Sequence, residues 1–221
     1  MKTWLLLLVG LSTNCFGFTA SAEERLALLI GNQSYGPKVG ALNNPHKDIE
    51  LVGSSLQRLG FNVVSKKDLG RADIMREVSS FVTRLRNGGD RAVGFVYYSG
   101  HGVSRPIDRS NYLIPVDVTD MQDPNIWWNT VALETLVNEL RIGAPKAAHI
   151  VVFDACRNEL LVPEKSAVKG FSAMDERDGL FIAFSTSPKA SASDQGTDGG
   201  HYARALASEL IGIDEVVSVL N

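Results

Sequence analysis

The sequence has 221 residues, of which 44% are hydrophobic and 21% are charged, and its formal net charge is −3. This length is sufficient for one sizeable hydrophobic core. Without an excess of basic residues there is no support for nucleic-acid binding, and no block of like charges suggests an interaction tail.

The first 22 residues have the layout of a secretory signal peptide. Lys2 precedes an apolar stretch over residues 4–11, and Ala20-Ser21-Ala22 supplies a small-residue cleavage site. The apolar stretch is shorter than the ~20 residues that cross a bilayer. We therefore expect export to the periplasm or the medium, with no membrane span in the mature chain; a buried first helix is the alternative. Cleavage leaves Cys156 as the one cysteine, either a buried small hydrophobe or a reactive thiol.

From residue 25 onward, short apolar runs alternate with segments of helical spacing. Strands are predicted at residues 25–30, 61–64, 93–101, 149–153 and 180–184, with a strand or hairpin arm at 112–114. Helices are predicted at residues 45–59, 74–85, 133–140 and 202–210, and the region 158–179 is predicted to be a long loop. Asn44 is expected to cap the first helix, with Pro45 at its first position. The alternation predicts an α/β fold, a three-layer sandwich with helices on both faces of a mainly parallel sheet.

Two of the predicted strands lead to residues that can carry out covalent catalysis. The 93–101 run brings His101 between two glycines, and the 149–153 run leads to Cys156. Functional groups of such sheets lie just past the carboxyl ends of the strands, so we expect Cys–His nucleophilic catalysis there. The flanking glycines are expected to allow unusual backbone angles, and the N–H groups of Gly102 and Cys156 to stabilise an oxyanion. The alternatives are an inert core thiol and an exposed loop histidine.

The motifs Tyr98-Ser99-Gly100-His101-Gly102 and Asp154-Ala155-Cys156-Arg157-Asn158 resemble the two signatures of the caspase-like clan of cysteine peptidases. The resemblance is closest to the bacterial metacaspase-like, or orthocaspase, branch and runs from about Leu26 to Leu210. It implies a peptidase C14-type caspase domain over residues 23–221. It also implies a Cys156–His101 dyad that forms a thioester acyl-enzyme, with a backbone carbonyl as the third member.

The resemblance also implies a substrate class. Asp48, Ser99 and Asp154 match positions that line the first specificity pocket (S1) of metacaspase-like enzymes. Carboxylates attract an Arg or Lys side chain, so we expect protein or peptide substrates cleaved after Arg or Lys. Taken alone, Asp48 is equally well explained by stabilisation of a helix N-terminus, and Asp154 by a turn at a strand end.

Further features follow from the same resemblance. Metacaspases often need calcium, and Asp117, Asp120 and Asp123 have a suggestive spacing, although no metal ligand is assigned to them. Residues 160–179 correspond to a linker that many clan members cleave, and the basic residues in it make self-cleavage an expectation. The resemblance implies a further strand after residues 213–217, so the domain is expected to be truncated or divergent at its C-terminus.

Two other functions are compatible with the sequence. A caspase-like fold can serve as a non-catalytic binding or scaffold module, and a flavodoxin-like ligand-binding domain would leave the thiol buried. His46, His149 and His201 are expected to be solvated or core histidines, and Trp127-Trp128 is expected to pack rather than to line a substrate groove.

Overall fold

The structure is a computed structural model that describes residues 23–105, 107–108, 110–157, 179–185 and 198–220, with the backbone alone at 156–157 and 213–220. The predicted signal peptide and the expected cleavage sites at Lys165, Lys169 and Arg177 lie outside the described residues.

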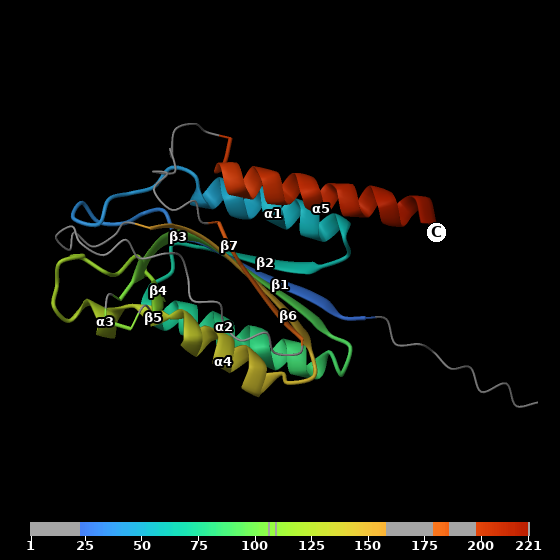
Figure 1. Cartoon of the computed structure of the whole chain (residues 1–221), viewed down its shortest axis with the longest axis horizontal. Coiled ribbons are helices and arrows are strands. Elements are labelled where there is room, and N and C mark those ends of the chain that lie inside the picture. Colours follow the sequence, from blue (N-terminus) through green and yellow to red (C-terminus); the bar gives the residue numbers. More distant parts are fainter. Residues whose placement is uncertain (1–22, 106, 109, 158–178, 186–197, 221) are drawn as a thin grey trace, which may run out of the picture.

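A single seven-stranded sheet forms the centre of the described chain (Figure 1). Its parallel strands, in spatial order, are β2 (Asn62–Lys67), β1 (Arg25–Gly31), β3 (Val93–Ser104), β6 (Ala148–Arg157) and β7 (Leu180–Phe184). Two short antiparallel strands, β4 (Asn111–Leu113) and β5 (Val131–Ala132), extend the sheet beside the last residues of β3.

Helices cover both faces of this sheet. The helices α1 (Pro45–Arg58) and α5 (His201–Leu220) lie side by side on one face, and α2 (Arg71–Asn87) and α4 (Leu133–Gly143) lie on the other (Figure 1). A one-turn helix, α3 (Ile126–Asn129), precedes β5. The fold class predicted from the sequence, a three-layer α/β sandwich, is therefore confirmed.

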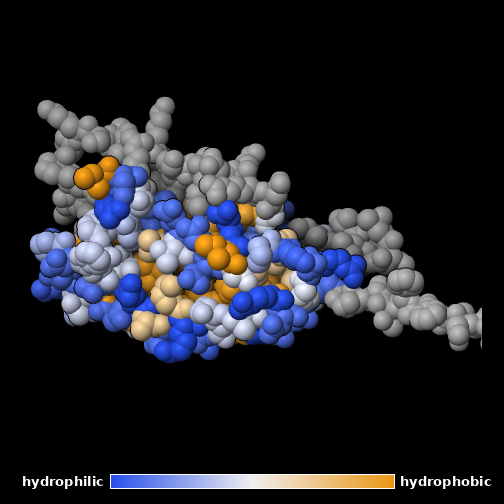
Figure 2. All heavy atoms as spheres, turned by 90° about the horizontal axis from the view of Figure 1, so that it is seen from below, coloured by the Kyte–Doolittle hydropathy of each residue, from blue (hydrophilic) through white to orange (hydrophobic). Residues whose placement is uncertain are grey.

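The central strands β1 and β3 are apolar on both sides because both sides are covered, whereas β2 at the sheet edge is partly exposed. In β1, Leu26, Leu28 and Ile30 pack toward α2 and α4, whereas Ala27 and Leu29 pack toward α1 and α5. The α2–α4 face of the molecule, seen in Figure 2, shows apolar side chains in its middle and polar ones around them.

Several element boundaries differ from those predicted. The third strand continues past His101 to Ser104, because β4 pairs with its last residues, and the strand predicted to end at residue 153 continues to Arg157 beside it. Neither α3 nor β5 was predicted. Asn44 is the residue before α1 but makes no side-chain capping hydrogen bond. In the described part of the chain, no helix combines the length and apolar character needed to cross a membrane.

The sheet has a fork on one side of β3. The β1 pairing ends at Gly31 opposite Ser99, and the β4 pairing begins at Leu113 opposite Gly102. We call this gap, at Gly100 and His101, the β1–β4 fork. Fully buried Asn32 lies where β1 leaves the sheet, and its backbone N–H donates to the Ser99 carbonyl at 2.9 Å. The fork matters because it contains one of the two candidate catalytic residues.

Candidate active site

The structure brings the predicted dyad positions together. In the parallel pairing of β3 with β6, His101 is the register partner of Cys156. His101 was predicted as the last residue of its strand and Cys156 beyond the end of its strand, whereas in the structure both positions lie within strands. The reason is the pairing of β4 with β3, which keeps β3 extended through this region.

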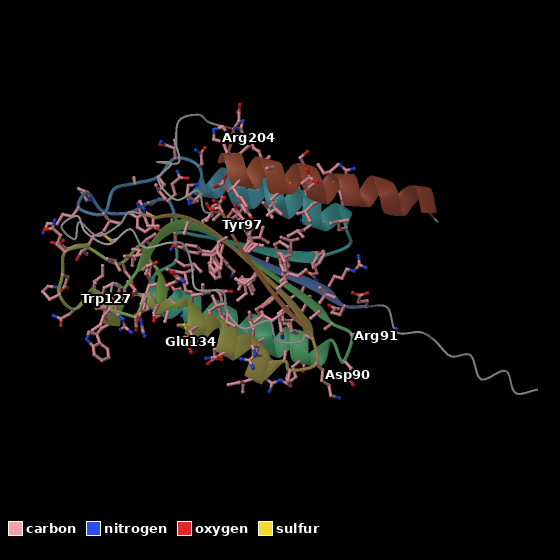
Figure 3. The ribbon with its side chains drawn as sticks, viewed as in Figure 1. Asp90, Arg91, Tyr97, Trp127, Glu134 and Arg204 are labelled. Carbon is pink, nitrogen blue, oxygen red and sulfur yellow. The ribbon has the colours of Figure 1, made fainter. Side chains whose placement is uncertain are left out.

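The candidate residues of β3 and β6 also share one face of the sheet. Side chains at every second strand position point the same way, and register partners of parallel strands share a face. Tyr97 packs in the cluster formed with α1 and α5 (Figure 3), so Ser99 and His101 lie on that face too. Their register partners on β6 are Asp154 and the backbone position of Cys156.

The imidazole of His101 is held by a backbone carbonyl. Its Nε2 atom lies 2.8 Å from the carbonyl oxygen of Gly40, and only 4% of the residue is exposed. Because a carbonyl can only accept, Nε2 carries the hydrogen, and a neutral ring then keeps its lone pair on Nδ1. This is the protonation pattern that a general base at Nδ1 requires. The phenol ring of Tyr35 packs against the imidazole with 4.6 Å between ring centroids.

The two glycines beside His101 have a different role from the one predicted. Neither Gly100 nor Gly102 has a positive φ angle, so unusual backbone conformation does not explain them. A Cβ atom at Gly100 would lie 2.7 Å from the hydroxyl oxygens of Tyr35 and Tyr98. At Gly102 it would lie 2.8 Å from the Cβ atom of Ala155. Both glycines are required by close packing on the face opposite His101.

The predicted pocket residues form two linked groups on the α1–α5 face. The first group is centred on Asp48, in the first turn of α1, which is 3% exposed. The Ser99 hydroxyl donates to its Oδ2 atom at 2.7 Å, and the backbone N–H of Gly200 donates to its Oδ1 atom at 2.6 Å. Asp48 therefore ties the start of α1 to β3 and to the residue before α5, and it does more than stabilise a helix N-terminus.

The second group is centred on Asp154, the register partner of Ser99. Its Oδ2 atom accepts a 2.8 Å hydrogen bond from the Tyr97 hydroxyl. Burial raises the pKa of the Asp154 carboxyl, while hydrogen bonds from Ser185 and Tyr97 act in the opposite direction. Burial, and then the charge of Asp154, raises the pKa of the Tyr202 phenol. The site thus combines a buried carboxylate from α1 with a half-buried carboxylate from β6.

Sequence reasoning did not identify four residues of this arrangement, although the resemblance implied a backbone carbonyl beside His101 without naming its residue. Tyr97 and Tyr35 contribute hydroxyl groups, whereas Gly40 and Gly200 contribute backbone atoms. The position of Tyr97, two residues before Ser99, is a signal that could have identified it. A backbone carbonyl or N–H group leaves no such signal, because any residue type supplies one.

The oxyanion prediction concerns backbone groups of β3 and β6. Gly102 lies between β4 and β6, with Leu113 and Arg157 as its register partners. The assignment of the Gly102 and Cys156 N–H groups to an oxyanion stays a prediction.

The three aspartates considered for calcium do not form a joint site. Asp117 accepts from the backbone N–H of Arg71, and Asp120 pairs with Lys38 at 2.8 Å. Asp123 accepts from the backbone N–H two residues later. Within the described ranges no group of three or more His, Cys, Asp or Glu side chains could hold a metal ion. These residues do not fit a calcium site, and no catalytic step is assigned to calcium.

The remaining histidines and tryptophans have ordinary structural environments. His46 Nε2 lies 3.0 Å from Asp68, which gives it a partner that the sequence did not reveal. His149 is buried, with Nε2 3.0 Å from a carbonyl oxygen, whereas His201 is exposed. Trp127, labelled in Figure 3, packs on Tyr112 as expected. Trp128 is 80% exposed, so the packing prediction is wrong for that residue.

The fold and the site together define an α/β domain with histidine and cysteine positions paired on adjacent parallel strands. The family model described as the caspase domain, peptidase C14, matches residues 24–221, and the chain belongs to this family. This confirms the caspase-like resemblance. A search of curated proteins found no match. Membership of a cysteine peptidase family makes proteins the implied substrates.

Proposed function

We propose that the chain is a cysteine endopeptidase in which Cys156 is the nucleophile and His101 is the general base and acid. The supporting observation is the register pairing of these two positions on one face of neighbouring strands. Strands in a sheet lie about 4.8 Å apart, which is compatible with proton transfer between a thiol and an imidazole.

The proposed reaction has two steps. In the first, Nδ1 of His101 takes the Cys156 proton, and the thiolate adds to the peptide carbonyl carbon. The C–N bond then breaks, the imidazolium gives its proton to the leaving amine, and a thioester forms. In the second step His101 activates a water molecule, which hydrolyses the thioester and returns the thiol. The Gly40 carbonyl contributes by keeping the hydrogen on Nε2.

We also propose that cleavage follows Arg or Lys. Asp48 and Asp154 lie on the same face of the sheet as His101, and Ser99 lies between them. The Ser99 hydroxyl donates to Asp48, and Ser99 is the register partner of Asp154. One buried and one half-buried carboxylate favour a cationic side chain and repel an acidic one. This preference is the one expected of the metacaspase-like branch, to which we assign the chain.

Peptide cleavage tests both proposals. The purified chain is given fluorogenic peptides that differ only in Arg, Lys or Asp before the scissile bond. We expect cleavage of the Arg and Lys peptides, with a loss of at least about 10³-fold in kcat/KM in both Cys156→Ala and His101→Ala. His201→Ala, which changes an exposed histidine, is the matched control and should retain full activity. Faster cleavage of the Asp peptide than of the Arg peptide would refute the pocket assignment.

Alkylation separates a peptidase from a non-catalytic scaffold. Iodoacetamide should react quickly with Cys156 at neutral pH, because an adjacent imidazolium stabilises the thiolate. The rate should fall in His101→Ala. Equal, slow rates in the two proteins would favour the scaffold function.

Self-cleavage and export complete the proposal. Wild-type protein is expected to cleave itself after Lys165, Lys169 or Arg177, and Cys156→Ala is expected to stay intact. Equal cleavage in both would assign the cut to another protease. Residues 1–22 support export, and N-terminal sequencing of the extracytoplasmic protein should begin at Glu23.

A further inference from the structure

Residues 32–42, the first part of the segment between β1 and α1, contact His101 at two different atoms. The carbonyl of Gly40 accepts from the ring, and the hydroxyl oxygen of Tyr35 accepts a 3.0 Å hydrogen bond from the backbone N–H of His101. The segment itself is closed, because the N–H groups of Tyr35 and Leu42 both donate to the Gln33 carbonyl at 3.0 Å. One loop therefore connects the backbone and the ring of the proposed general base.

The β1–β4 fork explains why a side chain is needed at this place. A buried backbone N–H must find an acceptor, and the neighbouring strand normally supplies one. At the fork β1 has already left the sheet and β4 has not yet begun. The phenol oxygen of Tyr35 takes the place of the missing strand carbonyl.

A second tyrosine completes the arrangement from the other side. The Tyr98 hydroxyl lies 3.2 Å from that of Tyr35 and 2.9 Å from the carbonyl oxygen of His101. Both hydroxyls also lie 3.0 Å from the carbonyl oxygen of Ile114. Each hydroxyl has one hydrogen, so Tyr35 can donate to Ile114 and Tyr98 to His101, which leaves the Tyr35 lone pairs toward the His101 N–H. Burial raises the pKa of Tyr35 to about 12, so this hydrogen is retained at neutral pH.

We propose that Tyr35 is a positioning residue for His101: its hydroxyl fixes the backbone of the histidine so that the ring meets both the Gly40 carbonyl and the Cys156 position. The inference rests on the proposed function only in naming His101 as the base. Tyr35 does not touch the substrate in this role, and it acts through the histidine alone.

The variant Tyr35→Phe removes the one oxygen and keeps the ring. We expect kcat for the Arg peptide to fall about tenfold, because small misplacements of a catalytic group are costly, with KM unchanged within about twofold. The pH profile of Cys156 alkylation should move to higher pH, because a displaced imidazolium stabilises the thiolate less. Tyr112→Phe makes the same one-atom deletion at a buried tyrosine of β4 that packs on Trp127, and should change neither quantity.

Nitrogen-15 NMR of the His101 ring provides a readout that does not depend on catalysis. The ring resonances, assigned by their loss in His101→Ala, should shift in Tyr35→Phe and stay unchanged in Tyr112→Phe. Unchanged His101 resonances in Tyr35→Phe would overturn the proposal, whether or not the protein cleaves peptides. The proposal would also be overturned if kcat per alkylatable thiol in Tyr35→Phe equalled that of the wild type, because the Tyr35 hydroxyl would then contribute to stability alone. If the proposed function is wrong, the wild-type protein will not cleave the peptides, and Cys156 will be alkylated at the same rate in the wild type and in His101→Ala.

Discussion

Replacing Gly100 with Ala tests the packing behind the candidate histidine. The new Cβ atom would lie 2.7 Å from both the Tyr35 and Tyr98 hydroxyl oxygens, and 2.9 Å from the Cζ atom of Tyr98. The Tyr98 ring is completely buried, so it cannot move away into solvent. Overpacking of this kind costs about 1–3 kcal/mol. Losing two of the hydroxyl hydrogen bonds adds about 1 kcal/mol each.

We therefore expect Gly100→Ala to lower the free energy of unfolding by about 3–5 kcal/mol, and Tm by about 10 °C for a domain of this size. Urea denaturation measures the first quantity and calorimetry the second. Gly36→Ala is the matched control, because nothing lies within 4 Å of a Cβ atom there, and it should stay within about 0.5 kcal/mol of wild type. A destabilisation of Gly100→Ala below about 1 kcal/mol would show that the tyrosine pair is not rigid, and would refute the reasoning.

Three further substitutions separate charge, hydrogen bonding and packing. Asp154→Asn should lower kcat/KM for Arg peptides at least about tenfold without lowering Tm at pH 7. Burial raises the pKa of the Asp154 carboxyl, so the charged form at pH 7 destabilises the folded state, and its removal should not lower Tm. A loss of more than about 5 °C in Tm would contradict this expectation. Burial alone would raise the pKa of Asp68, but donors that include the 33–34 backbone N–H groups hold it at about 2. The stabilisation by Asp68 is therefore present above pH ~4 and lost toward pH ~2. The urea midpoint should fall less between these two pH values in Asp68→Asn than in the wild type. An equal fall in the two proteins would argue against this role of Asp68. Gly102→Ala should destabilise by about 1–3 kcal/mol, and adding Ala155→Gly should restore stability, because Ala155 Cβ is the nearest atom at 2.8 Å; no recovery in the double variant would contradict the packing explanation.

The sequence was sufficient for the layers of the fold and for most of the candidate site. Apolar runs of strand length predicted the central parallel strands β1, β3 and β6, because strands covered on both faces are continuously hydrophobic. The two motifs also placed His101, Cys156, Ser99 and Asp154 in one expected site. These patterns are local, and the structure has the corresponding residues in register.

What the sequence did not reveal depends on contacts between distant segments. The length of β3 is set by its pairing with β4, whose three residues carry only a weak strand signal. The space requirement at Gly100 comes from Tyr98 on the same strand and from Tyr35, which lies on a different segment of the chain. Backbone groups such as the Gly40 carbonyl and the Gly200 N–H are chemically the same at every position, so their roles emerge only from the fold.

The alternation along β3 has a consequence for insertions and deletions. Adding one residue between Val96 and Ser99 would slip the strand by one position and turn His101 toward α2, while Gly100 would take its place beside α1. Adding two would restore the facing but move the imidazole about 7 Å along the strand, beyond the reach of the Gly40 carbonyl. The spacing of this short stretch is thus constrained by geometry even where individual side chains can be exchanged.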